Sequence, residues 1–125
     1  MSATETPLWQ PDASRIAAAN LSHFMVWCGE RHQRRFENYD ALWQWSVDNP
    51  EAFWCAIWEY CEVEGDAGVR TIDDITRMPG ARWFPEARLN FAQNLLRRRG
   101  NGDALVFCDE ESNYRRLSHD ELRGA

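Results

Sequence analysis

The sequence predicts a mostly α-helical chain of about four helices, followed by a β-hairpin and the start of a further helix. Apolar residues recur at helical spacing in four stretches, and capping residues, proline or glycine mark most of their ends. Toward the end of the chain, two short runs with apolar residues flank a polar turn, a pattern typical of a hairpin. A serine three residues before a glutamate then marks a new helix start.

The chain is long and apolar enough to fold around a core. It has 125 residues, of which 44% are hydrophobic and 13% aromatic, including seven tryptophans. A globule of this length buries roughly two-thirds of its unfolded surface. So many large apolar side chains can offset the loss of chain entropy, which argues against a disordered chain.

The first helix is expected from about Asp12 to Arg31, after an extended arm over residues 1–11. Asp12 or Ser14 can cap its free N–H groups. Gly29 suggests fraying near its end. The expected apolar stripe consists of Ala17, Leu21, Phe24, Met25 and Cys28.

Two further helices are expected in close succession. Residues 39–48 form a short helix with Asn38 as its cap. Residues 49–51 (Asn-Pro-Glu) then give a capping side chain, proline at the first helical position and a favourable acid, so a third helix should run to about Glu62. Its expected apolar face consists of Phe53, Trp54, Ile57, Trp58 and Cys61.

The fourth helix is expected over residues 86–99, after an irregular connection over residues 63–76 and a turn over residues 78–80. Residues 82–85 should be extended, because proline disfavours helix in the residue before it. Gly100 is the expected C-cap. The expected core stripe is Leu89, Ala92 and Leu96, widened by Phe91 and Leu95, and Arg97, Arg98 and Arg99 would form a solvated end matched to the helix dipole.

The hairpin has strands at residues 104–108 and 114–117 around a turn at residues 110–113. Ser118 and Glu121 then fit a capping box, so a helix should begin at about residue 119. Because the residues from 119 to 125 are too few to nucleate a stable helix, we expect this chain to be a piece of a longer one.

Charge and cysteine content narrow the class of protein. The net charge is −6, with 20 acidic and 14 basic residues, and this acidic excess argues against a nucleic-acid binder. Every base is arginine, so no lysine of this chain can contact a phosphate or activate an acyl group. No signal peptide and no run long enough to span a membrane is seen, so we expect a cytoplasmic protein. The four cysteines are expected to be reduced, with Cys55 and Cys61 in the core and no metal bound.

No catalytic, cofactor-binding or metal-binding residue is assigned from the sequence. It has no glycine-rich phosphate loop, no G-x-S-x-G elbow and no H-E-x-x-H motif. His23, His32 and His119 stand alone, and the acid pairs at residues 73–74 and 110–111 are expected to be solvated rather than catalytic. The tryptophans at 43, 45, 54 and 58 could form a stacking platform, but their interleaving with Phe53, Ile57 and Leu42 favours a core.

Three groups of residues together resemble one family. The pattern Ser-Val-x-x-Pro-Glu-x-Phe-Trp over residues 46–54 and Trp-Phe-x-x-x-x-Leu-Asn over residues 83–90 are similar to the N-terminal cap of the acetyl-CoA synthetase family. Leu-Trp-x-Pro at 8–11, Leu-Trp-x-Trp-Ser at 42–46 and Pro-Gly-Ala-Arg-Trp-Phe at 79–84 resemble most its acetoacetyl branch. The groups are residues 7–11, 15–17 and 21–25; residues 39–47 and 49–54; and residues 78–85, 87–92 and 94–96.

This resemblance, which covers residues 7–122, implies an adenylate-forming ligase whose parent fold is α/β overall. Residues 1–100 would be the helical cap, and residues 101–125 the start of the AMP-binding domain. The whole enzyme would join acetoacetate to CoA through an acyl-adenylate, using ATP and Mg²⁺, and would act in lipid and fatty acid metabolism. The family's phosphate loop and adenylation lysine lie further along, so this chain alone is expected to be inactive and to bind no cofactor. Its partner would be the remainder of its own AMP-binding domain.

Two other interpretations remain open at this point. The first is another short-chain acyl-CoA synthetase, acting on acetate or propionate. The second is a stand-alone, aromatic-rich helical interaction module. An isolated two-stranded hairpin is only marginally stable, which argues against the module.

Overall fold

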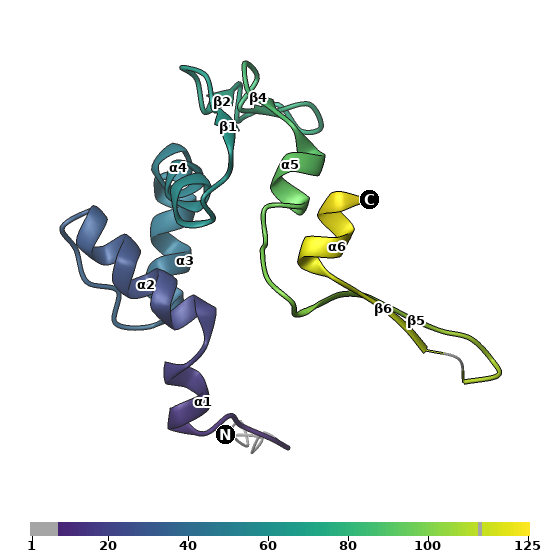
Figure 1. Cartoon of the computed structure of the whole chain (residues 1–125). Helices are drawn as coiled ribbons and strands as arrows, with labels where there is room; N and C mark the ends of the chain where they lie inside the picture. Colours follow the sequence, from purple (N-terminus) through teal and green to yellow (C-terminus); the bar gives the residue numbers. More distant parts are fainter. Residues whose placement is uncertain (1–7, 113) are drawn as a thin grey trace. The chain divides into compact units, whose positions relative to one another are not determined.

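The structure is a computed structural model that describes residues 8–112 and 114–125 (Figure 1). The expected arm therefore falls partly outside the described residues, and its described part, residues 8–11, is exposed and neither helical nor a strand. The chain divides into two compact units, Met1–Cys61 and Glu62–Ala125. Among the described residues there are six α-helices and three two-stranded antiparallel sheets, which confirms a mostly helical chain with strands.

The first unit begins with two helices where one was expected. These are α1, Ala13–Ala17, and α2, Asn20–Arg31. Asp12 caps α1 as predicted, since its Oδ1 accepts from the Arg15 N–H at 2.7 Å. The prediction of one continuous helix is wrong, because Ala19 is extended and the Ser22 hydroxyl donates to the Ile16 carbonyl, which a continuous helix would have used.

The break after α1 also changes the apolar stripe. Phe24 and Cys28 are buried and Met25 is half-buried, as predicted, but Ala17 and Leu21 are exposed. Gly29 is not a fraying position: it is buried, and α2 continues past it to Arg31.

Gly29 lies against the returning backbone, so its substitution is expected to be costly. A Cβ at this position would lie 2.6 Å from the carbonyl oxygen of Arg34. Gly29→Ala should therefore destabilise the first unit by about 1–3 kcal/mol, because the backbone must move to admit a methyl group. Urea unfolding followed by circular dichroism measures this loss. Gly124→Ala is the matched control, since nothing lies within 4 Å of its Cβ position, and an equal loss in both variants would contradict the prediction.

The next two helices are α3, Tyr39–Asp48, and α4, Pro50–Tyr60. Asn38 caps α3 as predicted, through its side-chain oxygen and the Ala41 N–H at 2.9 Å. Pro50 occupies the first turn of α4, but Asn49 does not cap it: its amide donates back to the Trp45 carbonyl at 3.2 Å. The helix ends two residues earlier than expected, and Glu62 has a positive φ of 51°.

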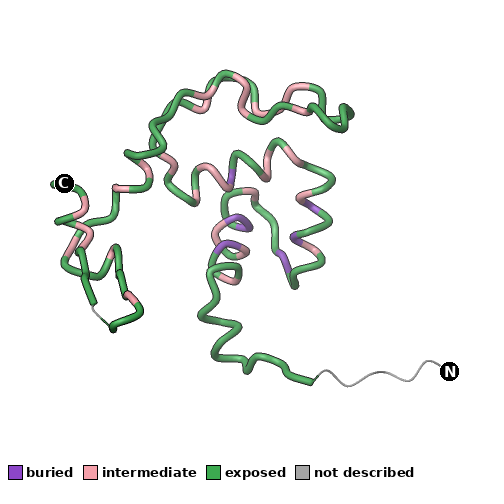
Figure 2. Tube along the Cα trace, turned by 90° about the vertical axis from the view of Figure 1, so that its right-hand side faces the viewer, coloured by how far each residue is buried: buried purple, intermediate pink, exposed green. Residues whose placement is uncertain are grey.

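The core of the first unit is built by α2, α3, α4 and the segment between α2 and α3 (Figure 2). Trp45 is 5% exposed, and its ring lies 5.3 Å from that of Phe36 and 6.3 Å from that of Phe53. The core residues are Phe24, Cys28, Phe36, Leu42, Trp45 and Ala56.

The inward face of α4 differs from the predicted one. Ala56 is buried, and Phe53, Ile57 and Tyr60 pack against the core, which is the usual i, i+3, i+4, i+7 spacing. The Tyr60 ring lies 5.0 Å from that of Phe24, so Tyr60, which was not on the predicted face, packs against the core. The predicted positions that do not reach the core cluster are Trp54, Cys55, Trp58 and Cys61, of which Trp58 is half-buried and the others are exposed.

The second unit contains paired strands that the sequence did not predict. Strand β1, Gly65–Asp66, pairs with β4, Arg88–Leu89, and β2, Ile72–Asp73, pairs with β3, Arg82–Trp83. The connection over residues 63–76 is therefore partly strand. The turn at residues 78–80 and the extended residues 82–83 are as predicted, but Phe84 has a φ of 45° and is not extended.

The predicted helix over residues 86–99 is wrong. Only α5, Phe91–Leu95, is helical, because β4 is held by its pairing with β1 and the Asn90 side chain caps a new helix at the Gln93 N–H, 3.2 Å away. Gly100 is consequently not its C-cap, which is Leu96, and the three arginines 97–99 lie beyond the helix. The predicted core stripe is mostly exposed: Leu89, Phe91, Ala92 and Leu95 are exposed, and only Leu96 is half-buried.

The predicted hairpin and final helix are confirmed. Strand β5, Asp103–Cys108, pairs antiparallel with β6, Tyr114–Ser118, and α6, His119–Gly124, follows directly. Ser118 and Glu121 form both hydrogen bonds of the capping box. The pairing shifts register between Asp103 and Leu105, which indicates a bulge at the start of β5.

Candidate functional site

Within residues 8–112 and 114–125, no group of three or more His, Cys, Asp or Glu side chains could hold a metal ion. In the same residues, no helix is long and apolar enough to cross a membrane. His23 is exposed, the His32 ring lies 4.8 Å from that of Trp45, and His119 begins α6.

Cys28 is buried, and Cys55, Cys61 and Cys108 are exposed. Only Cys28 is buried, against the prediction that Cys55 and Cys61 belong to the core. Burial raises the pKa of the Cys28 thiol, although the charge of Arg34 acts in the opposite direction. A raised pKa keeps the group as the neutral thiol, which is the unreactive form of cysteine.

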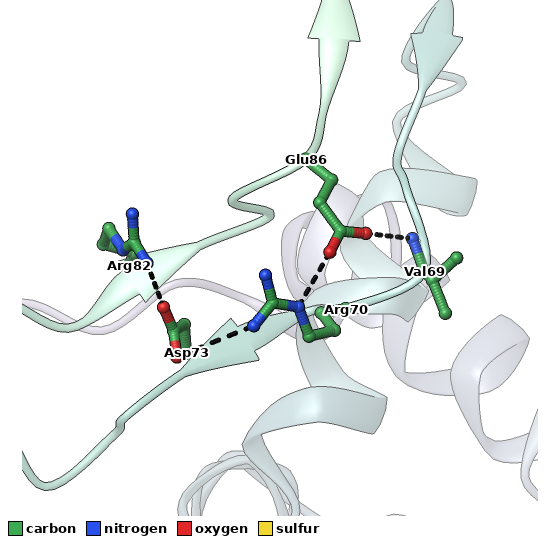
Figure 3. A network of polar contacts seen from close by, with 5 residues as sticks. All are labelled: Val69, Arg70, Asp73, Arg82 and Glu86. Atoms are coloured by element: carbon green, nitrogen blue, oxygen red, sulfur yellow. Dashed lines mark hydrogen bonds and ion pairs between the residues drawn. The ribbon is translucent and has the colours of Figure 1, made fainter.

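One polar cluster of the second unit is a network of two arginines and two carboxylates around β2 and β3 (Figure 3). Arg70 donates to Glu86 over 2.8 Å from Nε to Oε1, and the Val69 N–H donates to the other carboxylate oxygen at 3.0 Å. Arg82 donates to Asp73, and Arg70 lies 3.9 Å from the same carboxyl group. We call Arg70, Asp73, Arg82 and Glu86 the charged network.

The charged network keeps both of its acids ionised. The hydrogen bond and charge of Arg82 hold the pKa of Asp73 below its ordinary value of 3.8. The hydrogen bond from Arg70, and next that from the Val69 N–H, hold the pKa of Glu86 below its ordinary value of 4.5. A general acid or base near neutral pH needs a pKa shifted toward 7, so these carboxylates are suited to bracing a loop and not to proton transfer.

Arg70 is expected to be the main cause of the lowered pKa of Glu86. Arg70→Gln should raise that pKa toward 4.5, because it removes the charge and its ionic hydrogen bond. The native contact is fully formed above pH 4.5 and is lost as the pH falls through the lower pKa of the folded chain. A carboxyl ¹³C titration by NMR measures both midpoints. Arg31→Gln, which removes a pair with Glu59 at 3.1 Å, should leave Glu86 unchanged, and an unshifted Glu86 midpoint in Arg70→Gln would count against the assignment.

The sequence analysis singled out one member of the charged network, Asp73, and missed the other three. Asp73 was noted only as half of a solvated acid pair, whereas it is ion-paired, and Asp74 instead accepts from the Thr76 hydroxyl at 2.7 Å. The partners Arg70 and Glu86 are 16 residues apart. Residues so far apart in the sequence give no local pattern, and only the pairing of β1 with β4 and of β2 with β3 brings them together.

The second feature of this unit is the hairpin, which is tied to the segment that precedes it. The Gly100 N–H donates to the Asp120 carboxylate at 3.0 Å, and the His119 N–H donates to the Gly102 carbonyl at 3.1 Å. These bonds fix α6 at the base of the hairpin. The strands themselves remain uncovered, with Leu105, Val106, Phe107 and Tyr114 each more than half exposed.

Comparison with known proteins identifies what this arrangement is similar to. A family model described as acetyl-coenzyme A synthetase N-terminus matches residues 39–95. An acetoacetyl-coenzyme A synthetase of Rhizobium meliloti (strain 1021) is 51% identical over 119 residues, which are 95% of this chain and 18% of that protein. An acetoacetyl-CoA synthetase of Gallus gallus is 31% identical over 124 residues, which are 94% of this chain and 18% of that protein.

A solved structure agrees with these sequence matches. The acetoacetyl-CoA synthetase from Streptomyces lividans is 40% identical and superposes with a TM-score of 0.85, over 94% of this chain and 19% of that one. The chain thus spans about a fifth of the length of the relatives it matches. The matches confirm the resemblance inferred from residues 46–54 and 79–90, and they cover nearly the whole described chain rather than those patterns alone.

Proposed function

We propose that this chain is the N-terminal part of an acid–thiol ligase acting on acetoacetate. Residues 39–95 match the family model described as acetyl-coenzyme A synthetase N-terminus. The observation that carries the proposal is the 51% identity, over 95% of the chain, to a protein named acetoacetyl-coenzyme A synthetase. The superposition on the Streptomyces lividans enzyme supports the same branch.

In the proposed reaction, a carboxylate oxygen of acetoacetate attacks the α-phosphorus of ATP and displaces pyrophosphate, which gives an acyl-adenylate. The thiol of CoA then attacks the acyl carbon, loses its proton and displaces AMP, which gives acetoacetyl-CoA. Mg²⁺ accompanies ATP and would neutralise its phosphate charge. We assign none of these steps to a residue of this chain. In a ligase of this type, the steps would belong to the four-fifths of the relatives that the chain does not match.

The proposed division of labour follows the resemblance. Residues 1–100 would form the helical cap, and residues 101–125, with β5, β6 and α6, would open the AMP-binding domain. The partner of the cap would be the remainder of that domain. The two compact units of this chain divide between Cys61 and Glu62 instead. The boundary proposed at residue 100 is therefore a domain boundary of the whole ligase and not the boundary between these two units. We further propose that the enzyme is cytoplasmic and serves lipid and fatty acid metabolism.

The proposal predicts a preference between two acids. The ligase encoded by the whole reading frame that contains this chain should use acetoacetate with a kcat/KM at least ~10²-fold above that for acetate. A site with a donor for the second carbonyl oxygen would leave that donor unpaired when acetate binds, and such sites discriminate strongly. A coupled assay of AMP release, with and without CoA, measures both substrates.

The 125-residue chain alone is the control in that assay and should release no AMP. Equal kcat/KM values, or a preference for acetate, would move the protein to the second candidate, a short-chain acyl-CoA synthetase of the acetyl or propionyl type. The observation that favours this second candidate is the matched family model, which is named for acetyl-coenzyme A synthetase. Absence of any ATP-dependent thioester formation would defeat both.

A further inference from the structure

One face of the β5–β6 hairpin is apolar and uncovered. Leu105 and Leu117 lie directly opposite each other, and Phe107 is two residues along β5 on the same side. Their exposed fractions are 51%, 38% and 56%, respectively, with α6 in place, so α6 does not cover them. We call Leu105, Phe107 and Leu117 the hairpin face.

The hairpin face forms a shallow groove with a basic rim. Its lining consists of the three apolar side chains together with Arg115 and Arg116, and it contains no acidic residue. Arg116 forms an ion pair with Asp103. The bulge at the start of β5 places Asp103 on the side of the hairpin opposite to Leu105. Arg115 stands opposite Phe107 and has no carboxylate partner among the described residues.

The two sides of the hairpin differ in polarity. An antiparallel pair that faces water on one side alternates apolar and polar side chains, so that one face is apolar and the other polar. The side opposite the hairpin face carries the ion pair of Asp103 and Arg116, together with the exposed Val106 and Tyr114. The hairpin face is therefore the more apolar side of the two, and the side that a partner would cover.

The comparisons indicate where a cover for this surface would come from. The chain superposes over 94% of its length on a fifth of the Streptomyces lividans enzyme, so about four-fifths of such an enzyme lies outside the matched region. A partner within the same polypeptide needs no loss of translational freedom to bind, and a groove as small as this one can then be covered stably.

We propose that the hairpin face is the docking surface for the rest of the ligase's own AMP-binding domain, which covers Leu105, Phe107 and Leu117 with an apolar segment and meets Arg115 with a carboxylate at the rim. This inference rests on the proposed function for the existence of that domain. It goes beyond it in assigning the contact to particular residues and to one side of the hairpin.

The test measures whether position 107 is shielded in the whole ligase. Of the four cysteines in this chain, a background in which Cys55, Cys61 and Cys108 are replaced by serine keeps only the buried Cys28, and labelling is read by mass spectrometry on the peptide that carries the introduced cysteine. Phe107→Cys and Glu110→Cys are then made in that background and treated with a maleimide. Phe107→Cys should react at least ~10-fold more slowly than Glu110→Cys in the whole ligase, and at a similar rate to it in the urea-unfolded protein. Glu110, in the exposed turn of the hairpin, is the matched control.

Equal labelling at both positions in the folded ligase would overturn the proposal. Protection that grows with protein concentration would also overturn it, because the cover would then be a second copy of the chain. Amide exchange by mass spectrometry on the unsubstituted ligase gives a second measurement, in case Phe107→Cys fails to fold: strands β5 and β6 should be protected there and not in the 125-residue chain. Labelling is independent of substrate, so a ligase that prefers acetate would fail the proposed function and still show the protection.

Discussion

Trp45→Ala is expected to destabilise the first unit by about 3–5 kcal/mol, which is the usual cost of removing a large ring from a core. Trp45 is 5% exposed and lies within ring contact of Phe36, Phe53 and His32, so its loss leaves a cavity between α3, α4 and the segment before α3. The guanidinium of Arg34 also lies over this ring, 5.7 Å from its centre, and would lose that contact. Urea unfolding followed by far-ultraviolet circular dichroism measures the change.

The matched control is another tryptophan of the same helix. Trp43 is 51% exposed, so Trp43→Ala should cost less than ~1 kcal/mol. A loss in Trp43→Ala as large as that in Trp45→Ala would mean that the core is not where the structure places it. Trp54, which the sequence analysis placed on the apolar face of α4, is 40% exposed in this chain, so Trp54→Ala should fall between the other two.

The features that could be predicted from the sequence are those that depend on neighbouring residues. Asp12, Asn38 and the Ser118–Glu121 pair cap helices through hydrogen bonds to backbone groups three residues away, and all three were predicted. The hairpin was predicted for the same reason, since its two strands are joined by a short turn. Asn49, which was predicted to cap α4, shows the limit of such patterns, because its side-chain amide donates to the Trp45 carbonyl of α3 instead.

The features that could not be predicted depend on residues far apart. Residues 88–89 have the composition of a helix, but their pairing with residues 65–66 makes them a strand and shortens the helix after them. The charged network likewise depends on contacts over 16 residues. For the candidate site, the absence of catalytic motifs was readable from the sequence, whereas the hairpin face required knowing that α6 does not cover it. The family patterns at residues 46–54 and 79–90 gave more information about function than any cluster of reactive side chains did.

The 125-residue chain on its own is expected to self-associate. The hairpin has two strands, so each strand has one edge whose N–H and C=O groups have no partner strand in this sheet, and such edges pair with other chains. The hairpin face adds exposed apolar surface beside those edges. Sedimentation velocity over a series of concentrations should therefore show a growing share of dimers and larger species.

Two variants locate the cause of that association. Deletion of residues 102–125 should restore a monomer, because it removes both the strand edges and the hairpin face. The triple variant Leu105→Thr, Phe107→Thr, Leu117→Thr keeps the strands and should raise the dissociation constant by ~10-fold or more, which corresponds to about 1.4 kcal/mol of lost apolar contact. The control is Val69→Thr with Met78→Thr, two apolar residues that are 94% and 93% exposed outside any strand and whose change should leave association as it is. A monodisperse monomer at high concentration, with slow amide exchange in β5 and β6, would show that the hairpin is stable without a partner.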